Sequence, residues 1–431
     1  MKETKSIETL IAATAAARRR SVHRGKRFGR LASALAIALA STSVPAAAAT
    51  PESLTIPLKV VQIAGVGTKV GIEVSLGGGA PRLYTFDTGS SGFYAAYNPA
   101  WWPSSIPVGG GPIHQSYGSN LQLVANPVST TVGIATKEGV PISVTTTVGQ
   151  ITGASGTADG TAWLANVAAG NAPLYGMFFG DFGSGLKALN GMFAILPQLP
   201  GNLSSGFAVQ LGCNGNGLDP KVVVGLTDAM RSRVTAWVKM EKEDPNSPPF
   251  PNSNLPTYGQ ALFTGKFSLA QGATSYGFSV PAILDTGGGT TDIHQHAPEV
   301  KVPDALLDAA KNRVQSGVQF RVTAPGIAPG NDFDMAFLTG TTPTIDQVNV
   351  SQAGGNKAEV NLALNPYFRY DVVFDVAQGK VGFASCTVDG SNAPTAPIPA
   401  LSAWAMGLMT LLIVAVGCAN RRPRTRKPTS R

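Results

Sequence analysis

The sequence predicts a mainly β protein with two similarly built halves. Short runs of alternating apolar and polar residues recur between residues 50 and 388, as in half-buried strands, and helical periodicity is scarce there. The tripeptide Asp-Thr-Gly also occurs twice, at 87–89 and at 285–287, and each copy ends an apolar run. The two aspartates are 285 − 87 = 198 residues apart, about the length of one domain.

The first strands are predicted on either side of a glycine-rich turn. Residues 69–76 alternate between apolar and polar side chains, and 77–81 contain consecutive glycines followed by Ala and Pro. Such a segment favours a hairpin, which would lead into the apolar run before Asp87. A similar alternation at 142–148 predicts a further strand.

Two helices are expected in this part of the chain. The first candidate is 304–310, an Ala- and Leu-rich segment with Pro303 before it, and the second is 229–240. We expect one β lobe over residues 50–213 and another over 214–388, because each half is long enough to enclose a hydrophobic core.

The N-terminal end is typical of a targeting segment. Residues 1–30 are rich in Lys and Arg, 31–40 form a short apolar stretch, and small residues follow. This pattern predicts a signal peptide over 1–49, cleaved near Ala48 or Ala49, and therefore an exported protein. A cytosolic amphipathic helix is the alternative, which is disfavoured because the stretch after the basic leader carries no charge.

The C-terminal end predicts attachment to a membrane or to the cell surface. After a linker at 389–397, residues 398–431 hold an uncharged stretch and an Arg-rich tail. Residues 400–419 are long enough to cross the ~30 Å hydrocarbon core of a bilayer as a transmembrane helix, with the tail on the cytoplasmic side.

The start of this segment, Ile398-Pro399-Ala400-Leu401-Ser402-Ala403-Trp404, resembles the bacterial IPTL-type C-terminal sorting signals. That resemblance implies an exosortase-type processing enzyme as a partner and transfer of the protein to the cell surface. A plain anchor is the alternative, and it would leave the body of the protein at the periplasmic face of the inner membrane.

The body of the protein is slightly acidic, although the whole chain has a net charge of +8. Fifteen of the 33 Lys and Arg residues lie before residue 50 or after residue 399, and two of the 25 acidic residues lie before residue 50. The remaining charge is 18 − 23 = −5. Because no basic surface is left to follow a phosphate backbone, we expect no nucleic-acid partner.

Two cysteines belong to the exported part of the chain, because Cys418 lies in the apolar tail. Cys213 and Cys386 each end a strand-like run. In an oxidising compartment they are candidates for one disulfide, and two free buried thiols are the alternative.

Two aspartates from two halves of a chain can supply an acid and a base to one reaction. One carboxylate takes a proton from water while the other acid protonates or polarises an amide carbonyl. Two carboxyls close together cannot both ionise at low cost, so they share a proton and titrate as a pair. Peptide hydrolysis by this route needs neither a metal nor a cofactor, and none is expected.

These motifs resemble those of the pepsin-like aspartic proteases over most of the region from residue 50 to 388. Residues 86–94 match the first catalytic segment of that family, 283–287 the second, and 366–384 its C-terminal strands. The resemblance implies a bilobal pepsin-like acid protease fold with the active-site cleft between two β lobes. It also implies an aspartic endopeptidase that acts as a monomer on protein or peptide substrates, prefers apolar side chains beside the cleaved bond, and is inhibited by pepstatin.

The same resemblance assigns roles to individual residues. Asp87 and Asp285 would be the catalytic pair, and Ser90 would hydrogen-bond the outer oxygen of Asp87. The threonines of the two motifs would bond across the junction between the lobes. The dyad would be supported by Thr88, Gly89, Ser90, Thr286 and Gly287, and the flap over the substrate would be formed by Tyr117, Gly118 and Ser119 beside Tyr94.

Several positions depart from the pattern of that family. Gly288 replaces a Thr or Ser after the second motif, which would deprive the outer oxygen of Asp285 of a hydroxyl donor. Tyr94 replaces a Trp that braces the flap tyrosine. Asn120 replaces a flap Gly. Asn365 replaces the Gly of an apolar-apolar-Gly loop in the second lobe, and the equivalent loop in the first lobe would be 178–180. Asn tolerates positive φ better than most residues do, so both loops are expected to survive.

Three other hypotheses remain open at this stage. The chain could be a catalytically impaired binding module with the same fold. Residues 284–293 also resemble the second phosphate loop of actin-like and heat-shock-type ATPases, in which Asp87 and Asp285 would lie near Mg²⁺. Finally, His294 and His296 could contribute to a metal site, although no third ligand is evident in the sequence.

Overall fold

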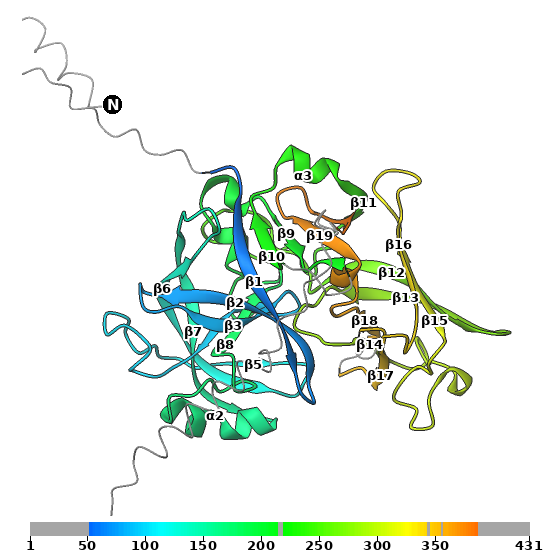
Figure 1. Ribbon diagram of the computed structural model, residues 1–431, viewed down its shortest axis with the longest axis horizontal. Helices are drawn as coiled ribbons and strands as arrows, with labels where there is room; N and C mark the ends of the chain where they lie inside the picture. Colours follow the sequence, from blue (N-terminus) through cyan, green and yellow to red (C-terminus); the bar gives the residue numbers. More distant parts are fainter. Residues whose placement is uncertain (1–50, 214–218, 343–344, 355–356, 387–431) are drawn as a thin grey trace, which may run out of the picture. The chain divides into compact units, whose positions relative to one another are not determined.

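The computed structural model describes residues 51–213, 219–342, 345–354 and 357–386. These residues form two β sheets with few and short helices, which confirms the prediction of a mainly β protein (Figure 1). The predicted signal peptide, the linker and the C-terminal sorting segment lie outside the described residues. Within the described ranges, no helix is long and apolar enough to cross a membrane.

The larger sheet contains thirteen of the described strands. Their spatial order is β11-β20-β19-β9-β10-β1-β2-β3-β8-β4-β7-β6-β5, and β2 also pairs with β6. The strands are β1 (Leu54–Ile63), β2 (Gly67–Leu76), β3 (Arg82–Asp87), β4 (Ser91–Ala96), β5 (Ile113–Ser116), β6 (Gln122–Ile134), β7 (Ile142–Ser155), β8 (Gly180–Ser184), β9 (Phe207–Gln210), β10 (Lys221–Val224), β11 (Val234–Lys239), β19 (Tyr370–Asp375) and β20 (Lys380–Ser385).

The smaller sheet contains seven described strands, all from the second half of the chain. Their spatial order is β16-β15-β12-β13-β18-β14-β17. The strands are β12 (Ala261–Gln271), β13 (Thr274–Ile283), β14 (Thr291–Gln295), β15 (Gln319–Ala324), β16 (Phe333–Leu338), β17 (Val348–Gln352) and β18 (Glu359–Asn361).

One arrangement of five strands occurs in both sheets. It runs β2-β3-β8-β4-β7 in the larger sheet and β12-β13-β18-β14-β17 in the smaller one. In each case the second and third strands pair in parallel, and so do the fourth and fifth. The first Asp-Thr-Gly begins at the last residue of β3, and the second begins two residues after β13. The two halves therefore present the motif from the same topological position.

The last two described strands join the larger sheet, although most of the described second half builds the smaller one. β19 pairs with β9, and β20 pairs with β11 and β19. Close by in the sequence, Cys213 and Cys386 form a disulfide with their Cα atoms 5.6 Å apart. This is the pairing considered from the sequence, and it links the end of the first predicted lobe to the end of the second.

Burial follows the position of each strand in its sheet. β16 near the edge alternates buried and exposed residues one by one, as a strand with one covered face does. β4 and β8 in the interior of the larger sheet are buried at every position, because both faces are covered. One of these buried strands, β8, pairs directly with the motif-bearing strand β3 and supports the loop that follows.

The helices differ from the sequence prediction. The segment 304–310 contains only one 3₁₀ turn, because Leu307 pairs with Val314 in an isolated bridge. The predicted helix 229–240 is a short helix followed by β11. The longest described helix was not expected. The helices are α2 (Ala158–Ala168), η2 (Leu196–Gln198), η3 (Gly201–Ser204), α3 (Asp228–Ser232), η5 (Asp304–Leu306) and η6 (Pro366–Phe368).

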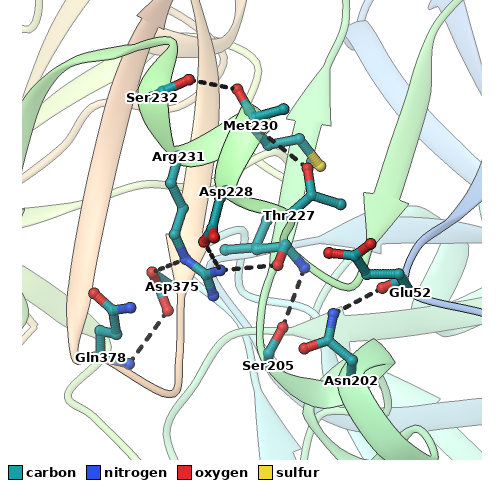
Figure 2. Close-up of polar contacts among 12 residues, drawn as sticks. Glu52, Asn202, Ser205, Thr227, Asp228, Met230, Arg231, Ser232, Asp375 and Gln378 are labelled. Atoms are coloured by element: carbon teal, nitrogen blue, oxygen red, sulfur yellow. Dashed lines mark hydrogen bonds and ion pairs between the residues drawn. The ribbon is translucent and has the colours of Figure 1, made fainter.

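A buried ion pair holds α3 against the turn after β19 (Figure 2). The Nε atom of Arg231 donates to Asp375 at 2.8 Å, and Nη1 donates to the Leu226 carbonyl at 2.9 Å. Thr227 caps the helix by accepting a hydrogen bond from the Met230 amide at 3.2 Å. The Asp375 side chain is fully buried, and its charge is compensated by this guanidinium and by the more distant ammonium of Lys380 at 3.9 Å.

Candidate active site

The two Asp-Thr-Gly loops meet through reciprocal hydrogen bonds between their threonines. The Thr88 hydroxyl donates to the Leu284 carbonyl at 2.8 Å and accepts from the Thr286 amide at 3.0 Å. The Thr286 hydroxyl donates to the Phe86 carbonyl at 2.6 Å and accepts from the Thr88 amide at 3.1 Å. Both threonines are buried. The loops are therefore joined by four hydrogen bonds that water does not reach.

Each motif folds back on its own aspartate in the same way. Oδ1 of Asp87 accepts from the Gly89 amide at 2.7 Å and from the Ser90 amide at 3.0 Å. Oδ1 of Asp285 accepts from the amides of the second and third residues after it, at 2.7 and 2.9 Å. These backbone amides are the groups that a phosphate loop would turn toward a nucleotide, and here the carboxylates occupy them. The second motif also leads into β14 rather than into a helix, which further disfavours the ATPase hypothesis.

The glycines of the motifs let each carboxyl lie against the opposite loop. A Cβ atom added to Gly89 would lie 2.4 Å from Cγ of Asp285. One added to Gly287 would lie 2.3 Å from Oδ2 of Asp87. No side chain fits at either position, so only glycine permits the two carboxyls to approach one another.

The surroundings of Asp87 favour its protonated form. Burial is the main cause that raises the pKa of Asp87 well above its usual value. The negative charges of Asp285 and Asp181, and a hydrogen bond with Asp285, raise it further, whereas the Gly89 amide acts in the opposite direction. Asp285 is less deeply buried than Asp87. The two carboxyls thus form an interacting pair in which one proton is retained.

A third carboxylate, Asp181 on β8, lies beside this pair. Its Oδ1 accepts from the Thr85 hydroxyl at 2.6 Å, and its Oδ2 accepts from the Ser90 hydroxyl at 2.6 Å and from the Tyr117 hydroxyl at 3.0 Å. Burial raises the pKa of Asp181 to about 6, and the three hydroxyl donors limit the rise. The expected bond from the Ser90 hydroxyl to Asp87 is replaced by one to Asp181, since a hydroxyl has one proton to donate.

The predicted flap is the turn between β5 and β6. Tyr117 begins the turn, and Gly118 and Ser119 are exposed at its tip. Asn120 has φ 69°, so it adopts the left-handed conformation expected of a residue in place of a glycine. The hydroxyl of Tyr94 donates to Gln115 on β5 at 3.5 Å, so it braces the flap strand and not the flap tyrosine. The flap is attached to the site through Tyr117 and Asp181.

Asn361 on β18 supplies the donor that seemed to be missing at Asp285. Its Nδ2 donates to Oδ2 of Asp285 at 2.6 Å. The hydroxyl donor that Gly288 does not supply to this oxygen is therefore replaced by an amide, from a side chain 76 residues along the chain.

Asp181 and Asn361 occupy equivalent places in the two halves. Asp181 lies opposite Thr85 in the parallel pair β3–β8, and Asn361 lies opposite Ile283 in the parallel pair β13–β18. Thr85 and Ile283 each precede their motif aspartate by two residues. The same strand position therefore carries an acid beside Asp87 and an amide beside Asp285.

The apolar-apolar-Gly segments were placed wrongly from the sequence. The strand beside β3 brings Asp181-Phe182-Gly183 to the motif, and not 178–180. Asn365 has φ −52°, so it does not replace a left-handed glycine, whereas Ala363 has φ 50°. The side chain of Asn365 donates instead to the Thr291 hydroxyl at 2.8 Å.

Sequence reasoning missed both Asp181 and Asn361. A weak signal exists, because each begins a triplet of a polar, an apolar and a small residue, Asp-Phe-Gly at 181–183 and Asn-Leu-Ala at 361–363. The pairing of these triplets with the motif strands makes them recognisable, and that pairing is a tertiary property.

His294 is engaged with carboxylates. It lies 3.4 Å from Asp292 and 3.1 Å from Glu359. Hydrogen bonds with these two acids raise the pKa of His294 to about 9, and the bond with Asp292 has the larger effect. Across the described residues, no group of three or more His, Cys, Asp or Glu side chains is arranged to hold a metal ion.

Comparisons with known proteins give no relative: no family model matches the chain, and no curated protein matches it either. The geometry of the two loops and the pattern of their motifs are therefore the basis for any assignment of function.

Proposed function

We propose that this chain is a pepsin-like aspartic endopeptidase, with a catalytic pair formed by Asp87 and Asp285 between two β lobes. One observation carries the proposal above all others. Two Asp-Thr-Gly loops, 198 residues apart in the chain, are joined by reciprocal threonine hydrogen bonds. Each carboxyl then lies against the glycine of the opposite loop. This arrangement brings an acid and a base together without a metal.

The chemistry follows from one shared proton. The ionised carboxylate takes a proton from a water molecule, whose oxygen adds to the carbonyl carbon of the peptide bond, while the protonated carboxyl gives its proton to the carbonyl oxygen. The carbon–nitrogen bond then breaks as a proton passes from the pair to the leaving amine. Acid–base assistance of this kind contributes ~10² to 10⁴ in rate. The flap tyrosine Tyr117 would close over the substrate next to this pair.

The two reasons for the hypothesis of a catalytically impaired binding module are weakened by the surroundings of the residues concerned. It was based on Gly288 and Asn365, and Asn361 now supplies the donor that Gly288 lacks. Asn365 forms buried hydrogen bonds of its own, and its loop remains ordered around Ala363. Neither residue, therefore, removes a group that the proposed reaction needs.

The proposal includes export and surface attachment. The basis is the sequence of the two ends: a signal peptide over 1–49 and a sorting segment over 398–431 that an exosortase-type enzyme would process. The disulfide between Cys213 and Cys386 is in keeping with an oxidising compartment. The substrates would then be proteins or peptides outside the cytoplasm.

Cleavage of a denatured protein tests the proposal. The purified chain is incubated with denatured casein between roughly pH 3 and 7, a range that covers ordinary and raised carboxyl pKa values. The wild type is expected to produce peptides, and Asp87→Asn is expected to produce none. The matched control is Asp244→Asn, because Asp244 is exposed and its side chain accepts a hydrogen bond from the Asn246 amide, which an amide oxygen can also do.

Equal cleavage by wild type and Asp87→Asn would end the proposal, as would a wild-type chain that cleaves nothing across the range. Loss of cleavage in the Asp244→Asn control as well would trace the effect to handling of the variants, and then the activity could not be assigned to the pair. Pepstatin is expected to stop the cleavage by wild type.

A further inference from the structure

The two aspartates of the pair have unlike neighbours, although the strands around them are equivalent. Asp181 stands beside Asp87, and its donors are three neutral hydroxyls. Asn361 stands at the equivalent position beside Asp285 and donates an amide proton to it. The carboxyl of Asp87 therefore has another acid as its neighbour, whereas the carboxyl of Asp285 has a hydrogen-bond donor as its neighbour.

We infer that Asp181 and Asn361 are positioning residues that cause a division of roles between the two aspartates. Asp285 is the base toward water, and Asp87 is the acid toward the carbonyl. The inference rests on the proposed function and goes beyond it, because two Asp-Thr-Gly loops by themselves do not say which carboxyl holds the proton.

The contacts of Asp285 stabilise its ionised form. Its Oδ1 accepts two backbone amides, and its Oδ2 accepts Nδ2 of Asn361 at 2.6 Å. Hydrogen bonds donated to a carboxylate favour the charged form. A hydroxyl at residue 288 has little room to do the same, because a Cβ atom on Gly288 would lie 3.0 Å from both Oδ2 of Asp285 and Cβ of Ala363. Asn361 reaches that oxygen from the neighbouring strand instead.

The contacts of Asp87 favour its neutral form. Ser90 gives its hydroxyl proton to Asp181 and leaves Asp87 with backbone donors to Oδ1. Asp87 is also 9% exposed, and the charge of the 3% exposed Asp181 opposes its ionisation. Because the pKa of Asp181 is about 6, this opposition grows as the pH rises toward neutrality. Asp181 therefore extends the pH range in which Asp87 keeps its proton.

Asp181 is not linked to Asp87 alone, because the charge of Asp285 also raises the pKa of Asp181. The remaining titratable groups around the pair do not reverse this division. Burial raises the pKa values of the nearby tyrosines, so their phenols stay neutral in the working range. One cation approaches the second motif, the ammonium of Lys69, which donates to the Gly287 carbonyl on the Asp285 side. Its positive charge also favours the ionised form of Asp285. The tyrosines are Tyr94, Tyr117, Tyr175 and Tyr367.

The pH dependence of kcat/KM tests the division, because it reports the ionisation of the free enzyme's base and acid. Initial rates of casein cleavage are measured for the full chain at low substrate concentration. In Asn361→Ala the acid limb, which belongs to Asp285, is expected to move up by about one pH unit, as the loss of a charge-assisted hydrogen bond implies. In Asp181→Asn the alkaline limb, which belongs to Asp87, is expected to move down by about one unit.

Three further variants separate this role from a structural one. Asn361→Asp has the shape of asparagine but no amide donor, so it should move the acid limb in the same direction even if the alanine variant folds poorly. Asp346→Asn removes a buried carboxylate that pairs with Arg369 away from the Asp-Thr-Gly loops, and it should move neither limb. Asp181→Ala removes the hydrogen bond to the flap tyrosine as well as the charge, so it should lower the rate more than Asp181→Asn does.

The outcomes are distinguishable. A wild type that cleaves nothing would overturn the proposed function and this inference with it. A cleaving wild type whose two limbs stay in place in Asn361→Ala, Asn361→Asp and Asp181→Asn, with only the height of the profile reduced, would overturn the inference alone. Limbs that move in the opposite directions would assign the base to Asp87 and also refute it.

Discussion

The hydroxyl of Thr286 offers a direct measure of how firmly the two motif loops are joined. Thr286→Val keeps the shape of the side chain and removes the group that donates to the Phe86 carbonyl at 2.6 Å and accepts from the Thr88 amide at 3.1 Å. Thr286 is completely buried, so water cannot replace either bond. Each unpaired buried group costs about 1–3 kcal/mol, and two of them predict a loss of about 2–6 kcal/mol in the free energy of unfolding.

Urea unfolding of the full chain, followed by circular dichroism, gives this quantity by linear extrapolation. The matched control is Thr257→Val, since Thr257 is also buried but its hydroxyl makes one hydrogen bond, to the Pro248 carbonyl at 3.1 Å. Thr88→Val should cost at least as much as Thr286→Val, because the Thr88 hydroxyl also lies 2.7 Å from the Tyr367 hydroxyl. A loss at Thr286 no larger than at Thr257, with an unchanged m value, would refute the reasoning.

Two other predictions concern charges away from the catalytic pair. Arg231→Met should lower the free energy of unfolding by about 3 kcal/mol, because it leaves the fully buried Asp375 with the more distant Lys380 as its nearest cation. Arg321→Met, at the exposed pair with Asp334, should have a much smaller effect, and both are read from urea unfolding at neutral pH. The pKa of His294 is raised to about 9 in the folded protein, from an unfolded value near 6.5. The pairing of His294 with its two carboxylates therefore stabilises the fold fully below about pH 6.5, and this contribution is lost as the pH rises through about 9. His294→Gln should therefore destabilise the chain by about 1 kcal/mol near pH 6 and leave it nearly unchanged at pH 10, and an equal effect at both pH values would contradict the assignment.

Local sequence was sufficient to single out the two loops. Asp-Thr-Gly needs little context to be recognised, because the glycine permits close approach and the threonine hydroxyl can cross to a neighbouring chain segment. Alternating strands were equally readable, since β7, which contains the predicted strand 142–148, begins with alternating buried and exposed residues. The sequence also reduced the possible disulfides to one pair, because it left two cysteines outside the apolar tail.

The helices show where local patterns stop being informative. Residues 304–310 have a favourable helical composition, yet Leu307 pairs across to Val314 directly after one 3₁₀ turn. There the pairing of the segment, and not its helix propensity, decided the outcome. α2 was missed although its cap is a local signal, since Thr157 accepts from the Gly160 amide at 3.0 Å.

The surroundings of the two aspartates were decided by tertiary structure alone. β3 and β4 follow one another in the chain, but β8 lies between them in the sheet, and β18 likewise separates β13 from β14. Which side chain faces each carboxyl thus depends on the register of a strand that arrives much later in the sequence. The sequence by itself determined that two aspartates would be presented from similar loops. Strand insertion placed an acid beside one and an amide beside the other, because parallel pairing joins segments that no local periodicity connects.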